Sequence, residues 1–224
     1  LKRRFPGLTR RERSFRVLLS FDVDQPFAGA GRPFLSVARS LASDAKKRRP
    51  PSMLIDRARA WLTHDYANDP CSTFDYLMDE AEKRSLRAAF YFIAAHTGGR
   101  VDGDYTLDQP PIRALMKRIH ERGHEIGLHT SYNTYNNAAQ IIRERDTLAA
   151  ALEAAGIDQP VRGGRQHWLR WEPSITWQLW EHAGLAYDST VGFYDSVGFR
   201  ASTCYYVSTY TIVLRQALML RELP

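Results

Sequence analysis

The sequence is poor in cysteine and contains no long apolar run. Only Cys71 and Cys204 occur among its 224 residues, and they form no CxxC pair. This excludes a disulfide-built scaffold and is compatible with either a reducing or an oxidising compartment. No apolar stretch approaches the roughly 20 residues of a transmembrane helix. The N-terminus also lacks the apolar segment of a signal peptide, so we expect a cytoplasmic protein without a transmembrane segment.

The sequence also lacks a nucleic-acid-binding signature, although its formal net charge is +6. The surplus is concentrated in basic runs at residues 1–16 and 44–51. Such runs are usually solvated. No zinc finger, helix-turn-helix or aromatic RNA-binding motif accompanies them, so we do not expect nucleic acid as the main partner.

The length and composition suit one globular domain, because 44% of the residues are hydrophobic and can form a full core. We predict a basic arm at residues 1–14 and a single domain at 15–224. An irregular insertion with one or two short helices, rich in proline, glycine and arginine, is expected at about 25–70. The oligomeric state is left open.

Apolar β-favouring runs alternate with segments of helical periodicity. Strands are predicted at 16–21, 87–95, 124–129, 161–169 and 185–190, and helices at 72–84, 108–122, 137–155 and 172–184. This alternation is typical of an α/β protein with a parallel sheet. An open doubly wound sheet and a (β/α) barrel are the two candidate architectures, and in both the functional residues gather where strands end.

Two aspartates follow the first strand, in the segment "SFDVDQP". Asp22 and Asp24 are two residues apart in an extended chain, so both point the same way. Two carboxylates this close repel unless they share a cation or a proton. One interpretation is a metal ligand beside a catalytic base; another is a pair of turn aspartates. A third is the D-x-D element of a glycosyltransferase that uses a nucleotide sugar.

The segment "GHEIGLHTSYN" carries two histidines on one predicted strand. Strand alternation places His124 and His129 on opposite faces, so they cannot both bind one metal. His129 lies at the C-terminal end of the strand, where a site is expected. His124 lies at its start and is predicted to be structural.

Together, "FDVD", "AAFYFIAAHT", "RGHEIGLHT" and a later strand ending in arginine resemble the polysaccharide deacetylase family. This is the NodB homology domain, carbohydrate esterase family 4. The resemblance implies a distorted (β/α) barrel and a divalent metal such as zinc, cobalt or manganese. It also implies hydrolysis of N-acetyl (or O-acetyl) groups on a polysaccharide or amino-sugar glycan. Asp22 matches the catalytic base of the family, and Asp24 and His129 match metal ligands.

The sequence departs from the family pattern at two histidines. Asn133 stands where the family has its second metal histidine, so it is the aligned candidate ligand, and His167 is a candidate replacement. The late histidine that acts as general acid has no counterpart after His182. Either the general acid lies beyond Pro224, in an incomplete barrel, or the activity is impaired.

The remaining candidates lie in "VRGGRQHWLRW" and beside His129. Of Arg162 and Arg165, we favour Arg165 as the arginine that pairs with the catalytic base and fixes its orientation. Trp168 and Tyr132 are predicted to contact the carbohydrate. A glycan-binding domain without catalysis and a D-x-D glycosyltransferase are the alternative functions.

Overall fold

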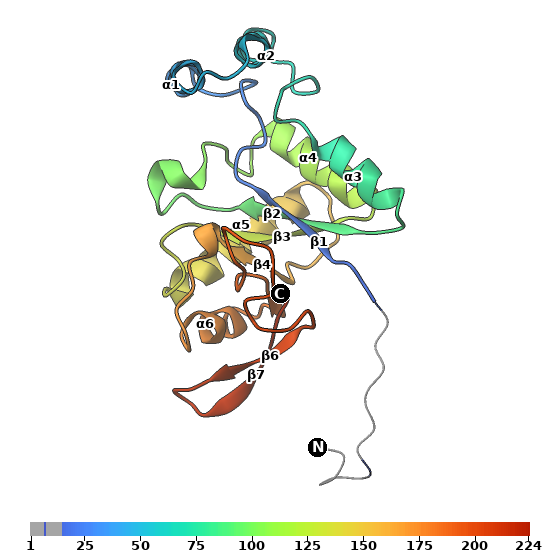
Figure 1. Ribbon diagram of the computed structural model, residues 1–224, viewed down its shortest axis with the longest axis vertical. Helices are drawn as coiled ribbons and strands as arrows, with labels where there is room; N and C mark the ends of the chain where they lie inside the picture. The colour runs from blue at the N-terminus through green and yellow to red at the C-terminus, as the bar shows by residue number, and fades with distance from the viewer. Residues whose placement is uncertain (1–6, 8–14) are drawn as a thin grey trace.

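The structure, a computed structural model, describes Gly7 and residues 15–224. Apart from Gly7, the predicted basic arm at 1–14 therefore lies outside the described residues. The described residues form one seven-stranded sheet and six α-helices (Figure 1). The strands are β1 (Leu19–Val23), β2 (Ala88–Ile93), β3 (Glu125–Thr130), β4 (Gly163–Gln166), β5 (Tyr187–Asp188), β6 (Val207–Thr211) and β7 (Gln216–Glu222). The predicted α/β class is confirmed.

The strand order follows the chain through most of the sheet. It is β1-β2-β3-β4-β5-β7-β6, with parallel pairing throughout except between β6 and β7. A doubly wound sheet reverses its strand order at a switch point, and this sheet has no such reversal among its first five strands. Within the described residues β1 and β6 are the sheet edges and do not pair, so a closed barrel is not confirmed.

The helices lie between successive strands of the chain, and α3 to α6 pack on one face of the sheet. They are α1 (Phe34–Lys46), α2 (Pro51–Thr63), α3 (Phe74–Glu82), α4 (Pro110–Glu121), α5 (Ala138–Ala154) and α6 (Thr176–His182). α4 contacts α5 and α5 contacts α6, as expected for helices laid side by side over one surface. Among the described residues, no helix combines the length and apolar character needed to cross a membrane.

The hydrophobic core lies between this face and the helices. The alternation of β2 and β3 turns Phe90, Phe92, Ile126 and Leu128 toward the helices, and all four are fully buried. They meet the apolar stripes of α3, α4 and α5, which include Met78, Ile112, Leu115, Ile119, Ile141 and Leu148. Burial of this apolar surface is the main stabilising term for the sheet–helix layer.

The opposite face of the sheet is polar and concave. Arg165 of β4 donates hydrogen bonds to Ser20 and Asp22 of β1, although β2 and β3 lie between the two strands. On a flat sheet, strands three places apart are separated by roughly 14 Å, which is beyond the reach of an arginine side chain. The sheet must therefore curl strongly. Gly127 leaves room on the concave face, because a Cβ there would lie 2.6 Å from the Tyr91 ring.

The predicted insertion at 25–70 contains two helices, α1 and α2, of 13 residues each. They pack against each other at the end of the molecule opposite the β6–β7 hairpin (Figure 1). The turn that enters the insertion is held by Asp69, whose carboxylate accepts hydrogen bonds from the backbone N–H groups of residues 28, 29 and 30. This contact fixes the segment that directly follows Asp24.

Candidate metal centre

Three side chains from different strand ends converge at the C-terminal edge of the sheet. Asp24 directly follows β1, His129 is the fifth residue of β3, and His167 directly follows β4. The Nε2 atom of His129 lies 3.3 Å from Asp24 Oδ1, and that of His167 lies 3.6 Å from the same oxygen. One ligand atom from each residue lies within 4.8 Å of those of the other two. The cluster includes the predicted ligands Asp24 and His129 and the predicted replacement His167.

The donor set and its spacing fit a divalent cation. Ligand atoms about 2.1 Å from a tetrahedral metal lie roughly 3.4 Å from one another, close to the two separations from Asp24. Two imidazole nitrogens and one carboxylate are a common protein ligand set for zinc, with a further position left for water. The two histidine side chains are buried, whereas that of Asp24 is 52% exposed. The cluster therefore opens to solvent on the Asp24 side.

The outer ring nitrogens of both histidines have partners that set the tautomer. His129 Nδ1 lies 2.8 Å from the backbone carbonyl of Arg165, and His167 Nδ1 lies 2.8 Å from Asp102 Oδ1. A carbonyl oxygen and a carboxylate accept hydrogen bonds, so each Nδ1 carries the proton and donates it. Each Nε2 therefore faces Asp24 and, when it carries no proton, offers a lone pair to a metal. This arrangement of a metal-binding histidine backed by an acceptor is usual in metal sites.

The electrostatics of the cluster also favour a cation. Burial would lower the pKa of His129, but the hydrogen bond with Asp24 and the negative charges of Asp22 and Asp24 raise it above its usual value. Burial would raise the pKa of Asp24, but the hydrogen bond with His129 and the charges of His129 and His167 lower it. The raised pKa of His129 reflects the negative charge of Asp22 and Asp24, which would also attract a metal cation, and the lowered pKa of Asp24 keeps that carboxylate ionised.

Asp22 is beside this cluster and is held by an arginine. Arg165 Nη1 donates to Asp22 Oδ1 over 2.9 Å, and the other carboxylate oxygen lies 4.0 Å from His129 Nε2. Arg165 is itself fixed, because it donates to the Ser189 carbonyl and to the Ser20 hydroxyl. Its guanidinium also lies over the Tyr91 ring. Of the two arginines considered from the sequence, Arg165 is the one whose side chain binds Asp22.

Asn133, the other predicted ligand, has different partners. Its Nδ2 donates to the Thr97 carbonyl over 2.8 Å, and its Oδ1 accepts from Arg170 Nη1 over 3.0 Å. A metal would have to bind the Oδ1 atom, and the positively charged Arg170 guanidinium already donates a hydrogen bond to that atom. We therefore assign Asn133 to the loop that supports the site, and not to the ligand set.

The two predicted carbohydrate-contacting residues lie at the rim. Trp168 follows His167 directly and its side chain is largely exposed, at 68%. Its backbone has φ of 59°, a left-handed conformation that is uncommon for a bulky residue and is typical of functional sites. The Tyr132 ring lies edge-on to the Trp168 ring at 6.3 Å, and the Arg170 guanidinium lies over Tyr132 at 4.0 Å.

Two further residues show how far the sequence identified the site. His124 accepts from the Ala88 N–H and contacts Glu82, so it has the structural role predicted for it. Asp102 was not identified from the sequence, although it is fully buried and contacts His167. It also accepts from the backbone N–H groups of Gly98 and Tyr132. In the sequence, Asp102 stands out only as an acidic residue in the loop that follows a predicted strand.

A second buried acidic pair lies on β5 and β7, away from the cluster. Asp188 and Glu222 are register neighbours with fully buried side chains. Burial and the negative charge of Asp188 raise the pKa of Glu222 to about 9, despite its hydrogen bonds with Val191 and Trp177. The pair therefore retains a proton at neutral pH.

Comparisons of this chain with protein family models, with curated proteins and with solved structures find no match. The resemblance of its motifs to the polysaccharide deacetylases therefore stays a prediction.

Proposed function

We propose that this chain is a metal-dependent carbohydrate deacetylase of the NodB type, with the curled sheet as a distorted, incomplete (β/α) barrel. The substrate would be an N-acetyl (or O-acetyl) group on a polysaccharide or amino-sugar glycan. The observation that carries the proposal is the convergence of Asp24, His129 and His167 beside the Asp22–Arg165 pair. It supplies a ligand set and a potential base within one concave surface.

Asp24, His129 and His167 would hold the divalent metal, which the donor set suggests is zinc, cobalt or manganese. When bound, such a metal polarises an acyl carbonyl and lowers the pKa of a water. The Arg165 carbonyl and the Asp102 carboxylate would keep the two imidazoles in the tautomer that offers Nε2.

Asp22 would act as the general base. Its carboxylate would take a proton from the attacking water as the oxygen adds to the acetyl carbon. The proton held by Asp22 would then pass to the amide nitrogen as the C–N bond breaks, so that the sugar amine and acetic acid are released and Asp22 is again a carboxylate. Arg165 would hold the Asp22 carboxylate in the orientation needed for this transfer.

Trp168 and Tyr132 would contact the sugar ring at the rim. The exposed indole face of Trp168 offers an apolar surface to the C–H groups of a pyranose, and Tyr132 braces it edge-on. Arg170 positions Tyr132 from its other side and also binds the Tyr132 carbonyl. The aromatic residues would therefore present the acetyl group toward the buried histidines.

The test is acetate release from N-acetylglucosamine oligomers and from acetylated xylan, with zinc, cobalt or manganese added to chelator-treated protein. We expect metal-dependent release by the wild-type protein and loss of release in Asp24→Asn. Asp195→Asn, at an exposed residue of the 189–206 segment, is the matched control and should retain activity. Binding of these glycans without release under any metal would instead indicate a non-catalytic glycan-binding domain. Stabilisation by a nucleotide sugar alone would indicate a glycosyltransferase.

A further inference from the structure

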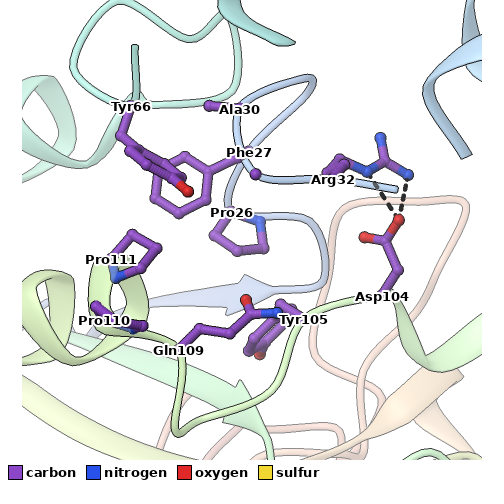
Figure 2. A pocket seen from close by; sticks show the side chains of 11 residues that line it. Pro26, Phe27, Ala30, Arg32, Tyr66, Asp104, Tyr105, Gln109, Pro110 and Pro111 are labelled. Carbon is purple, nitrogen blue, oxygen red and sulfur yellow. Dashed lines mark hydrogen bonds and ion pairs between the residues drawn. The ribbon is translucent and has the colours of Figure 1, made fainter. Parts of the chain in front are cut away.

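The insertion forms one wall of a cavity next to the metal centre. The cavity has a volume of about 150 Å³ and lies between residues 26–32, Tyr66 and the loop at 104–111. Figure 2 shows the Phe27 and Tyr66 rings on one side of the opening and Gln109 with the two prolines of α4 on the other. A cavity of this size accommodates one six-membered ring.

The lining combines ring surfaces with polar groups that have no partner of their own. The Tyr66 hydroxyl and the Gln109 side-chain amide make no hydrogen bond within the part of the chain that the structure describes. An apolar ring would strip water from these two groups without replacing its hydrogen bonds, at a cost in free energy. A ring that carries hydroxyl groups would satisfy them while its C–H surface packs on Phe27 and Tyr66.

The backbone of the cavity wall is held by hydrogen bonds within the insertion. Asp69 accepts three consecutive backbone N–H groups from residues 28–30, and Trp61 donates to the Arg32 carbonyl. Arg32 forms an ion pair with Asp104 at the rim, over 2.7 Å (Figure 2). Groups held in place in this way lose little conformational entropy on binding, which favours affinity for a small ligand.

The cavity and the metal centre share structural elements. Pro26 lies two residues after Asp24, and the Tyr105 hydroxyl donates to the Val23 carbonyl. The same loop that lines the cavity through Asp104 and Tyr105 also carries Asp102, the partner of His167. The cavity and the metal centre are therefore held by the same two loops, which favours a ligand that reaches from one to the other.

We propose that this cavity binds a pyranose residue of the glycan, next to the residue that carries the acetyl group. The inference rests on the proposed function for the identity of the ligand as part of the substrate. Tyr66 and Gln109 would recognise its hydroxyl groups, and the insertion would determine which sugar occupies this position.

The experiment measures binding of single methyl pyranosides of glucose, mannose, galactose, rhamnose and N-acetylglucosamine by saturation-transfer NMR titration. The proteins are the wild type, Asp24→Asn and the double variant Tyr66→Phe with Gln109→Leu. Asp24→Asn disables the metal centre and leaves the cavity, so it separates the two sites. Tyr76→Phe, at an exposed tyrosine on α3, is the matched control.

We expect at least one pyranoside to bind the wild type, Asp24→Asn and Tyr76→Phe with equal affinity, and to bind the double variant at least fivefold more weakly. The single variant Gln109→Leu should lose part of that affinity, and it changes a side chain without intramolecular hydrogen bonds, so its folding is preserved. The inference is overturned if no pyranoside binds, or if affinity is the same in the double variant. If the proposed function alone is wrong, the result differs: a pyranoside still binds to the cavity, but no acetate is released.

Discussion

Asp102→Asn tests the environment of the proposed metal ligand His167. Asp102 accepts hydrogen bonds from His167 Nδ1 over 2.8 Å, from the Tyr132 N–H over 2.7 Å and from the Gly98 N–H over 2.5 Å. An asparagine has one acceptor oxygen and one NH2 group, so at least one of these donors would face another donor. The change keeps the size of the side chain and removes its negative charge.

The expected loss has two parts. Asparagine can keep an oxygen toward His167 but not the negative charge, and mutation of the group behind a metal-binding histidine typically lowers metal affinity tenfold to hundredfold, which is about 1.4 to 2.7 kcal/mol. A buried donor left without its partner costs about 1 to 3 kcal/mol of folding free energy. We therefore expect weaker zinc binding in a protein that unfolds at a lower urea concentration.

Calorimetric titration of zinc into chelator-treated protein measures the first part, and urea unfolding without metal measures the second. Asp104→Asn is the matched control, because Asp104 lies in the same loop but binds Arg32 and Ser36. The reasoning is refuted if folded Asp102→Asn binds zinc as tightly as the wild type. An equal loss of zinc affinity in the Asp104 variant would refute it as well, since the effect would then belong to the loop.

Three further changes test other parts of the structure. Asp22→Asn should lower acetate release at least 100-fold, the usual contribution of a general base, with zinc affinity kept within about threefold; unchanged release would exclude the assigned role. Glu222→Gln tests the buried acidic pair. Because the folded pKa of Glu222 is raised, to about 9, the native state holds a proton that the unfolded state releases above about 4.5. The free energy of unfolding of the wild type should therefore fall as pH rises between these values, by up to about 1.4 kcal/mol per pH unit. The free energy of unfolding, measured with urea at several pH values, should depend less on pH in Glu222→Gln than in the wild type. An equal pH dependence in the two proteins would contradict the assignment. Asp69→Ala leaves three buried backbone donors without an acceptor and should destabilise the protein by about 3 kcal/mol in urea unfolding. Asp65→Ala, at an exposed turn, should cost less than 1 kcal/mol, and similar losses in the two variants would contradict a special role for Asp69.

The sequence predicted the site where local pattern and sheet topology agree. Asp24 and His129 follow or end apolar strands, and parallel strands bring such ends to one edge. The opposite roles of His124 and His129 followed from strand alternation alone. Those two rules need no knowledge of how the sheet bends.

The rest of the site depends on features that local patterns do not encode. The family resemblance left Asn133 and His167 as alternatives for the second imidazole position, and the curl of the sheet brings His167 to Asp24 from the end of β4. Asp102 lies in a 3-10 turn, η1 (Gly99–Asp102), without apolar periodicity, so nothing marked it as a partner of His167. The helices expected within the insertion could not be located from the sequence, because prolines and arginines interrupt its pattern.

The most direct test of the account is the metal content of the purified protein after incubation with zinc, measured in the wild type, His129→Ala, His167→Ala and Asn133→Ala. The account predicts one zinc per chain in the wild type and in Asn133→Ala, and loss of the zinc in both histidine variants. It is contradicted if the wild type binds no zinc, cobalt or manganese, or if Asn133→Ala loses the metal while His167→Ala retains it.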